Sequence, residues 1–234
     1  SPQTRTGFQE THLGFQTPLA ALDSALGCLQ KPARVSKKPT RDSKKPLGFP
    51  KTTLAALDAP AAAELARGFN HRWVFEGDLA NVYVMLGVAL RDVGGLEPLF
   101  ARGMTDHPPD VRPGLSALTD SLAGYLSADE AARRGTRYFL SSTRGAGAAK
   151  RLMMFARWMV RASDLDLGLW SSARPDQLLI PLDTHVARIS RFIGLTERKG
   201  AGMRTVIEIT ERLRQVDPDD PVRFDFALSH LGIL

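Results

Sequence analysis

The spacing of apolar residues constrains the fold of this chain more than any other feature, because from about residue 78 onwards apolar residues recur at the intervals typical of a helix. Val82, Leu86 and Leu90 lie four residues apart, as on one face of a helix. Asp78 is the expected N-cap of that helix, and a Gly-Gly pair ends it. We predict helices over residues 79–92, 96–101, 115–126, 128–138 (capped by Ser127), 148–162, 184–194, 202–216 and 221–231. No strand-like alternation occurs over 81–234, so the sequence predicts an all-α domain.

The positive charge of the chain is concentrated near its N-terminus. Residues 31–51 contain eight Lys and Arg side chains against one acidic residue, Asp42, so this segment holds more than the net charge of +6. A stretch rich in Lys, Pro and Ser has too little apolar surface to offset the entropy lost on ordering. We therefore expect residues 1–58 to form a disordered, low-complexity basic extension and residues 59–234 to form one helical domain.

Composition excludes several classes of protein. The chain has 43% apolar and 24% charged residues, and no apolar run approaches the roughly 20 residues that span a bilayer. Cys28 is the single cysteine, so the chain can form neither an internal disulfide nor a thiolate metal cluster. No signal peptide is recognisable. We expect a cytoplasmic protein without membrane contact.

The segment 148–162 separates apolar and basic residues onto two sides. A step of 100° per residue places Leu152, Ala156 and Met159 on a core side. The other side carries Lys150, Arg157 and Arg161, with Arg151 at its flank. Such a face binds phosphates or is simply solvated, and both interpretations stay open. Upstream, the Gly145–Gly147 turn offers unpaired backbone N–H groups that can receive a phosphate.

Another helix start carries a carboxylate. Val186, Ile189 and Ile193 form the apolar stripe of the helix over 184–194, and Asp183 precedes it at the N-cap. An N-cap aspartate is common and needs no further role. The helix dipole also keeps such a carboxylate ionised and in place, so capping and catalysis are compatible roles.

The run Asp183-Thr184-His185-Val186, followed by Arg188-Ile189, resembles the aspartate motif of endonuclease III and its relatives among the helix-hairpin-helix DNA glycosylases. The upstream Gly-x-Gly and Lys150 are similar to the hairpin and lysine of that superfamily, and the resemblance covers residues 141–234. Lys150 lies three residues after Gly147, one more than in endonuclease III. The 33-residue separation of Lys150 and Asp183 looks more like that of archaeal 8-oxoguanine glycosylases.

A closer resemblance is to an uncharacterised bacterial family, a domain of unknown function. The matching segments are Ala149–Leu152, Met154–Phe155, Arg157–Arg161, Gly168–Trp170, Ile180–Val186, Ile209–Thr210 and Phe224–Leu228. That family brings no established activity.

The glycosylase resemblance implies cleavage of the N-glycosidic bond of a damaged, flipped-out DNA base. The transition state is oxocarbenium-like, and Asp183 is the candidate carboxylate that stabilises it. Lys150 is the candidate nucleophile, whose Schiff base with C1′ would add AP-lyase activity. Its place in the first helical turn, beside Arg151 and Arg157, favours the neutral amine that this attack needs.

The same resemblance implies contacts to DNA around these two residues. The candidates for the DNA backbone are Gly145, Gly147, Arg151, Arg157, Arg161, Arg188 and Arg191. Trp158 and Trp170 are candidates for stacking on a base or for the core, and His185 is expected to support the site structurally. We expect no metal site, because His71, His107 and His230 show no ligand spacing with His185. We expect no cofactor within this chain, because the iron–sulfur cysteines of endonuclease III relatives would follow Leu234, so the chain either lacks the cluster or was cut before it.

Three functions remain open. The first is a base-excision DNA glycosylase, with or without AP-lyase activity. The second is a catalytically inactive DNA- or RNA-binding protein on the same scaffold, which needs the arginines but neither Lys150 nor Asp183. The third is a protein-interaction module that uses the acidic stretch 217–220 and the basic extension. We expect the first, with DNA as the partner.

Overall fold

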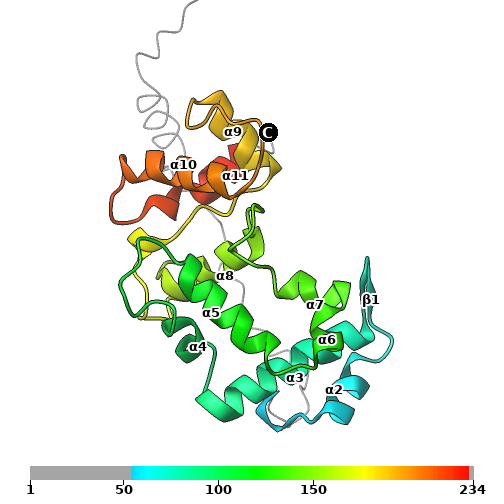
Figure 1. Cartoon of the computed structure of the whole chain (residues 1–234). Helices are drawn as coiled ribbons and strands as arrows, with labels where there is room; N and C mark the ends of the chain where they lie inside the picture. Colours follow the sequence, from blue (N-terminus) through cyan, green and yellow to red (C-terminus); the bar gives the residue numbers. More distant parts are fainter. Residues whose placement is uncertain (1–53, 232–234) are drawn as a thin grey trace, which may run out of the picture.

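The computed structural model describes residues 54–231, and the regular secondary structure of this part is almost entirely helical (Figure 1). The elements are η1 (Leu54–Ala56), α2 (Ala59–Ala66), β1 (Asn70–His71), β2 (Val74–Phe75), α3 (Glu76–Val93), α4 (Glu97–Ala101), α5 (Arg112–Ala123), α6 (Ala128–Ala132), α7 (Arg134–Phe139), α8 (Lys150–Val160), η2 (Pro175–Gln177), α9 (Thr184–Phe192), α10 (Met203–Arg214), η3 (Pro221–Phe224) and α11 (Asp225–Leu231). The predicted all-α class is confirmed. No helix within residues 54–231 has the length and apolarity needed to cross a membrane.

The folded part begins earlier than the sequence predicts. Residues 1–53 of the predicted extension lie outside the described residues, but residues 54–58 belong to the domain. The guanidinium of Arg91 on α3 donates hydrogen bonds to the carbonyls of Ala55 (2.7 Å) and Leu57 (3.2 Å). Asp58 caps α2 by accepting a hydrogen bond from the Ala61 N–H at 2.8 Å. Residues 54–58, which the sequence assigns to the extension, thus contact the helical domain.

Helix α3 also begins earlier than predicted, at Glu76, so Asp78 lies in its first turn and is not the N-cap. The buried Asp78 carboxylate accepts hydrogen bonds from the Phe75 N–H (3.0 Å) and from Arg133 (3.0 Å). The helix ends as predicted, at Gly94, whose φ of 78° is a left-handed conformation that favours glycine. Asp78 thus joins α3 to the segment before α7.

The single helix predicted over 128–138 is two helices, α6 and α7, which meet at Arg133. Ser127 caps α6 as predicted, accepting a hydrogen bond from the Glu130 N–H. Arg133 has an extended ψ of 137°, which ends one helix and starts the next. At Gly135 a Cβ atom would lie 2.3 Å from the Asp78 carboxylate, so only glycine allows α7 to pack this closely on α3.

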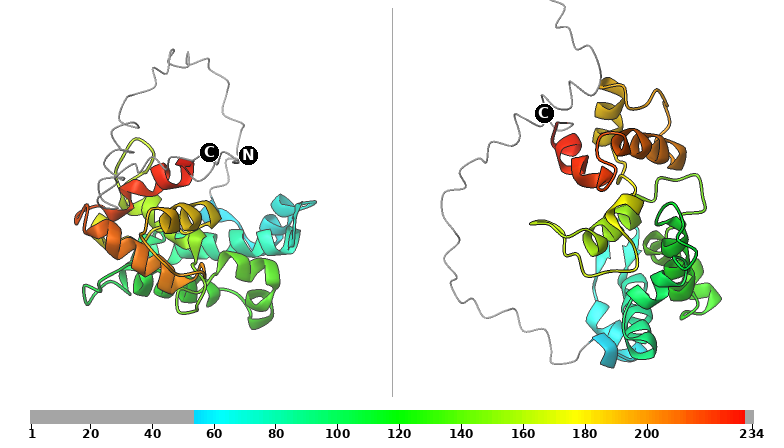
Figure 2. Two further views of the ribbon diagram at one scale, coloured as in Figure 1. Left: turned by 90° about the horizontal axis from the view of Figure 1, so that it is seen from above. Right: turned by 90° about the vertical axis from the view of Figure 1, so that its left-hand side faces the viewer.

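One buried apolar cluster runs from Met85 on α3 to Leu228 on α11, and a second, small cluster of Ala62, Ala66 and Ala80 packs α2 on α3. Figure 1 shows α9, α10 and α11 gathered at one end and α2, α3 and β1 at the other, with α5 and α8 between them. The right-hand view of Figure 2, turned about the vertical axis, shows the same order. Helices α5 and α8 therefore lie between the two ends of the molecule.

Candidate functional site

The two residues singled out for catalysis, Lys150 and Asp183, are in contact. Lys150 is the first residue of α8, and its Nζ lies 3.0 Å from Oδ2 of Asp183, which is 33 residues further along the chain. The other carboxylate oxygen of Asp183 accepts a hydrogen bond from the Val186 N–H at 2.8 Å. Asp183 is therefore the N-cap of α9, as predicted, and an ion-pair partner of Lys150 as well.

These contacts determine the charge of Asp183. Burial alone raises the pKa of its carboxyl, but hydrogen bonds from the Val186 N–H and from Lys150, together with the lysine's charge, outweigh burial. The pKa of Asp183 consequently lies below its ordinary value, and the carboxylate is ionised at neutral pH. An N-cap held from two sides has little freedom to turn away, so the negative charge is fixed in place.

The ion pair opens into a cavity of about 240 Å³. Its lining includes Lys150, Trp158, Leu165, Asp183, Asp225 and Phe226. Trp158, Leu165 and Phe226 are exposed to solvent although they are large and apolar. The predicted supporting residue Trp158 thus lies in the wall of the cavity and is 42% exposed.

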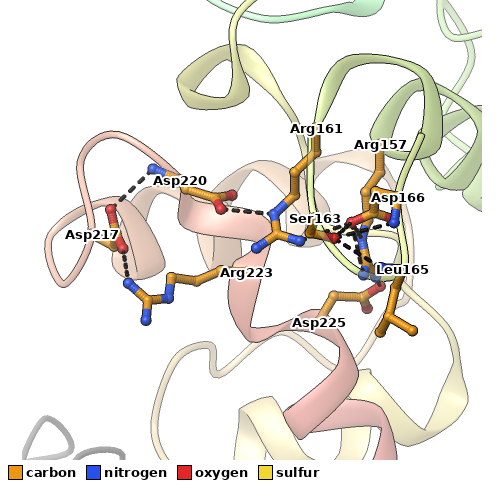
Figure 3. A network of polar contacts seen from close by, with 9 residues as sticks. All are labelled: Arg157, Arg161, Ser163, Leu165, Asp166, Asp217, Asp220, Arg223 and Asp225. Atoms are coloured by element: carbon orange, nitrogen blue, oxygen red, sulfur yellow. Dashed lines mark hydrogen bonds and ion pairs between the residues drawn. The ribbon is translucent and has the colours of Figure 1, made fainter. Parts of the chain in front are cut away.

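The basic side predicted for α8, with Lys150, Arg157 and Arg161, does not face outward as a whole. Arg157 is buried, and its guanidinium donates hydrogen bonds to Asp225 and, at 3.3 Å, to Asp166. Arg161 is bonded to Asp166 (2.8 Å) and Asp220 (2.7 Å), as Figure 3 shows. A buried guanidinium requires carboxylate partners, and these partners occupy the donors that we expected to face phosphates or solvent. The surface position predicted for Arg157 is therefore wrong.

This network builds the cavity wall. It ties α8 to the loop after it through Asp166, and to α11 through Asp225, the first residue of that helix (Figure 3). Phe226, next to Asp225, lines the cavity, and α11 packs on α9. Arg157 and its partners accordingly hold the helix that faces Lys150.

Asp225 is a further carboxyl at the site. It lines the cavity and is buried. Burial raises the pKa of Asp225 above its ordinary value, and the charge of Asp183 adds to the rise, although Arg157 opposes it. Of the three carboxyls that line the cavity, Asp183 and Asp225 thus have pKa values shifted in opposite directions, which is typical of functional sites. Within residues 54–231, no cluster of His, Cys, Asp and Glu side chains is arranged to hold a metal ion.

The remaining predicted residues are scattered. Arg151 lies over the Tyr138 ring, with its Cζ 3.1 Å from the ring centroid. Arg191 donates hydrogen bonds to the carbonyls of Arg198 (2.7 Å) and Lys199 (2.9 Å), and so holds the loop before α10. His185 and Arg188 are exposed on α9, each with a polar or ionic contact.

Trp170 is a core residue. It is 9% exposed and its ring packs on Phe100 and Phe155, with centroid distances of 4.9 and 5.3 Å. A buried indole that contacts two other rings has no face left for a base. The base-stacking alternative for Trp170 is therefore wrong, and its alternative as a core residue is confirmed.

The predicted glycine turn, Gly145–Gly147, lies against an identical triplet, Gly200–Gly202, at the start of α10. Gly147 and Gly202 form an isolated antiparallel bridge, and the Met203 N–H donates to the Ala146 carbonyl at 2.8 Å. Both triplets border a hollow of about 670 Å³ whose basic residues are Arg112, Arg144, Arg198, Lys199 and Arg204. Arg112, Arg144 and Arg198 are ion-paired with Asp110, Asp120 and Glu208. Lys199 and Arg204 form no ion pair with residues 54–231, so they are the cations of the hollow that could meet a phosphate beside the turn.

Sequence reasoning missed Asp166, Asp225 and the second glycine triplet. The repeated Gly-Ala-Gly triplet was a readable signal, since it occurs twice at helix starts. Asp225 lies in a matched family segment, but nothing in its neighbours indicates burial against an arginine 68 residues away. Asp166 precedes an exposed loop residue, Leu167, and carries no local signal of burial.

Comparison with known proteins gives one match. The chain matches none of the curated proteins and none of the solved structures with which it was compared. Residues 43–234 match a family model, in agreement with the resemblance to a domain of unknown function. Since this match covers most of the chain, the protein belongs to the family described as "Protein of unknown function (DUF2400)".

Proposed function

We propose that this protein is a DNA glycosylase on a helix-hairpin-helix-like scaffold, which removes a damaged base by cleaving its N-glycosidic bond. The observation that carries the proposal is the contact between Lys150 Nζ and Asp183 Oδ2 at 3.0 Å, in the wall of a cavity. These are the two residues to which the superfamily resemblance assigns the chemistry. The fixed, ionised carboxylate is the group that an oxocarbenium-like transition state requires.

The surroundings of the ion pair support a base as the ligand. The cavity of about 240 Å³ is smaller than the roughly 300–1,000 Å³ of pockets for drug-sized ligands, which favours an occupant as small as one base. Trp158 and Phe226 provide aromatic surface in its wall. The hollow beside Gly145 offers basic side chains for the phosphates of the strand that carries this base.

The reaction that follows from this arrangement is hydrolytic. The C1′–N bond breaks, its electron pair leaves with the base, and Asp183 stabilises the positive charge that develops on the sugar. Water then bonds to C1′, and its proton neutralises the departed base. In a lyase route, Lys150 Nζ first gives a proton to Asp183, and its free electron pair then attacks C1′ in place of water. The C1′–N bond breaks, the base leaves with the electron pair of that bond and takes up a proton, and the sugar ring opens to an imine with Lys150.

The test is base release from oligonucleotides that carry single oxidised, deaminated or alkylated bases. We expect Asp183→Asn to lower the rate at least about 100-fold, because a preorganised charge is lost. Asp92→Asn, an exposed aspartate on α3, is the matched control and should have the wild-type rate. Lys150→Arg keeps the cation but cannot form an imine, so borohydride trapping of wild type and not of Lys150→Arg would indicate the lyase route.

Two outcomes would contradict the proposal. If Asp183→Asn released the base at the wild-type rate, the carboxylate would have no part in the chemistry. If wild type released no base from any substrate but bound DNA, the scaffold-binding function would replace catalysis. Binding that is insensitive to salt and directed to protein would favour an interaction module.

A further inference from the structure

A second basic hollow, of about 640 Å³, lies apart from the Lys150–Asp183 cavity, beside the β1–β2 turn and α7. Its lining includes Trp73, Arg134, Arg137, Tyr138, Ser141 and Arg151. None of the described residues in this lining is acidic. The hollow therefore combines aromatic rings with positive charge, and neither the family match nor the proposed catalysis accounts for it.

The rings and guanidinium groups in this hollow are stacked on one another. Trp73 and Tyr138 meet edge to face, with centroids 5.7 Å apart and an interplanar angle of 82°. The Cζ of Arg134 lies 5.1 Å from the Trp73 ring centroid, and that of Arg151 lies 3.1 Å from the Tyr138 centroid. Trp73 is 37% exposed. Planar groups are thus held in fixed orientations with part of their surface in solvent.

The arginines of this hollow are uncompensated within the described part of the chain. Arg134, Arg137 and Arg151 form no ion pair with residues 54–231, whereas Arg144 nearby is paired with Asp120 at 2.6 Å. Burial even lowers the pKa of Arg151, and no carboxylate opposes this effect. Three cations without a counter-charge favour an anionic ligand.

We propose that this hollow binds a single-stranded segment of nucleic acid, with a base against the exposed part of Trp73 and phosphates on Arg134 and Arg137. Aromatic platforms next to arginines recognise single strands, because a free base stacks on a ring while its phosphate meets a cation. Bases inside a duplex are already stacked and cannot reach these rings. An acidic peptide would use the arginines but has no planar group for Trp73.

The hollow and the catalytic cavity share the first turn of α8. Lys150 lines the cavity and the next residue, Arg151, lines the hollow, because consecutive residues point about 100° apart around a helix. A strand held at Trp73 would therefore run past the start of α8. The binding does not rest on catalysis, since an undamaged strand offers the same bases and phosphates.

The experiment measures binding of fluorescein-labelled oligothymidylate to the 234-residue chain. We expect Trp73→Ala to weaken binding about five-fold or more, because it removes one stacked base. Trp73→Phe keeps a ring, so its affinity should stay within about two-fold of wild type while the quenching of tryptophan fluorescence by the strand decreases. Circular dichroism checks that both variants fold, and the exposure of Trp73 supports this expectation.

A second variant tests the charge. Arg134→Ala/Arg137→Ala should reduce the slope of log K against log salt concentration by about 1.4, the value for two phosphate contacts on a single strand. The control is Arg102→Ala/Arg212→Ala, which makes the same change of charge at two exposed arginines outside the hollow. It should leave the slope near that of wild type.

The proposal is overturned if the chain does not bind the strand, if Trp73→Ala binds as wild type does, or if the control pair changes the slope equally. Equal competition by polyglutamate and oligothymidylate would also overturn it and indicate general polyanion binding. None of these outcomes bears on base release, which is measured with Asp183→Asn, so failure of one proposal leaves the other standing.

Discussion

The two ends of α8 carry ion pairs of opposite character. At the first residue, Lys150 pairs with Asp183, and their side chains are 40% and 21% exposed. Two turns later, Arg157 pairs with Asp166, and their side chains are 9% and 0% exposed. An exposed pair contributes little to stability but stays accessible to a ligand, whereas a buried pair contributes to the fold and leaves no donor for one. Burial therefore decides which basic residues of one helix remain available for function.

The largest expected effect comes from breaking the buried end. Arg157→Ala leaves Asp225 without its guanidinium partner and leaves Asp166 with Arg161 alone. Removing one partner of a buried ion pair costs about 3–5 kcal/mol, because an uncompensated charge stays in a low-dielectric environment. We expect the free energy of unfolding, measured by urea denaturation, to fall by this amount.

The matched control for this measurement is Arg223→Ala. Arg223 pairs with Asp217 at 2.7 Å, and its side chain is half exposed, so its loss should cost at most about 1 kcal/mol. If Arg157→Ala were no more destabilising than Arg223→Ala, the contrast drawn between buried and exposed pairs would be wrong for this helix.

The sequence predicts one end of α8 better than the other. The contact between Lys150 and Asp183 follows from two helix starts and a resemblance, because N-caps and first turns are defined locally. The buried end depends on Asp225, which is 68 residues from Arg157. No local sequence pattern predicts which carboxylate the basic residues of a helix will pair with. A helical wheel sorts residues by polarity, so it placed Arg157 with the solvated residues.

The same limit applies to the start of the domain. Helix α2 starts with an N-cap, Asp58, and an early proline, Pro60, and both are local signals that can be recognised in the sequence. The packing of η1 on α3, by contrast, depends on Arg91 reaching two carbonyls more than 30 residues earlier. Helix positions were therefore predictable, whereas the extent of the domain was not.

Substitutions of Asp183 test the exposed ion pair, and they should change the free energy of unfolding less than Arg157→Ala does. Asp183→Ala removes the N-cap of α9 and should lower the free energy of unfolding by about 1 kcal/mol. Asp183→Asn keeps a side-chain acceptor for the Val186 N–H, so it should cost clearly less. Equal losses in the two variants, measured by urea denaturation, would mean that charge and not capping is the main contribution of this residue.

The pH dependence of the same variants follows from the shifted pKa. The hydrogen bonds to Asp183 outweigh its burial, and its folded pKa lies below the ordinary value of 3.8. As the pH falls, the unfolded chain takes up this proton first, so the stabilisation is complete above 3.8 and is lost as the pH falls through the folded value. The difference in the free energy of unfolding between wild type and Asp183→Asn should therefore decrease below pH 3.8. A difference that does not change with pH would contradict the lowered pKa of Asp183.

Lys150→Ala removes the other partner of the exposed pair. Because the lysine side chain is 40% exposed, we expect a loss of only about 0.2–1 kcal/mol, far below that of Arg157→Ala. The same variant should lose its effect at high salt, since exposed pairs are screened. A loss as large as that of Arg157→Ala would place Lys150 among the residues that hold the fold and would weaken its assignment to the site.

The smallest effect concerns the residue before Lys150. Ala149 has a φ of 45° and a ψ of 37°, a left-handed conformation that costs an alanine roughly 1–2 kcal/mol. Ala149→Gly relieves this strain but makes the unfolded chain more flexible, which takes back about 0.4–1 kcal/mol. We expect a net stabilisation of about 0.5 kcal/mol in urea denaturation, with the contact between Lys150 and Asp183 retained. Destabilisation would instead mean that the rigid alanine backbone is what holds Lys150 against Asp183, and base release by this variant should then fall as well.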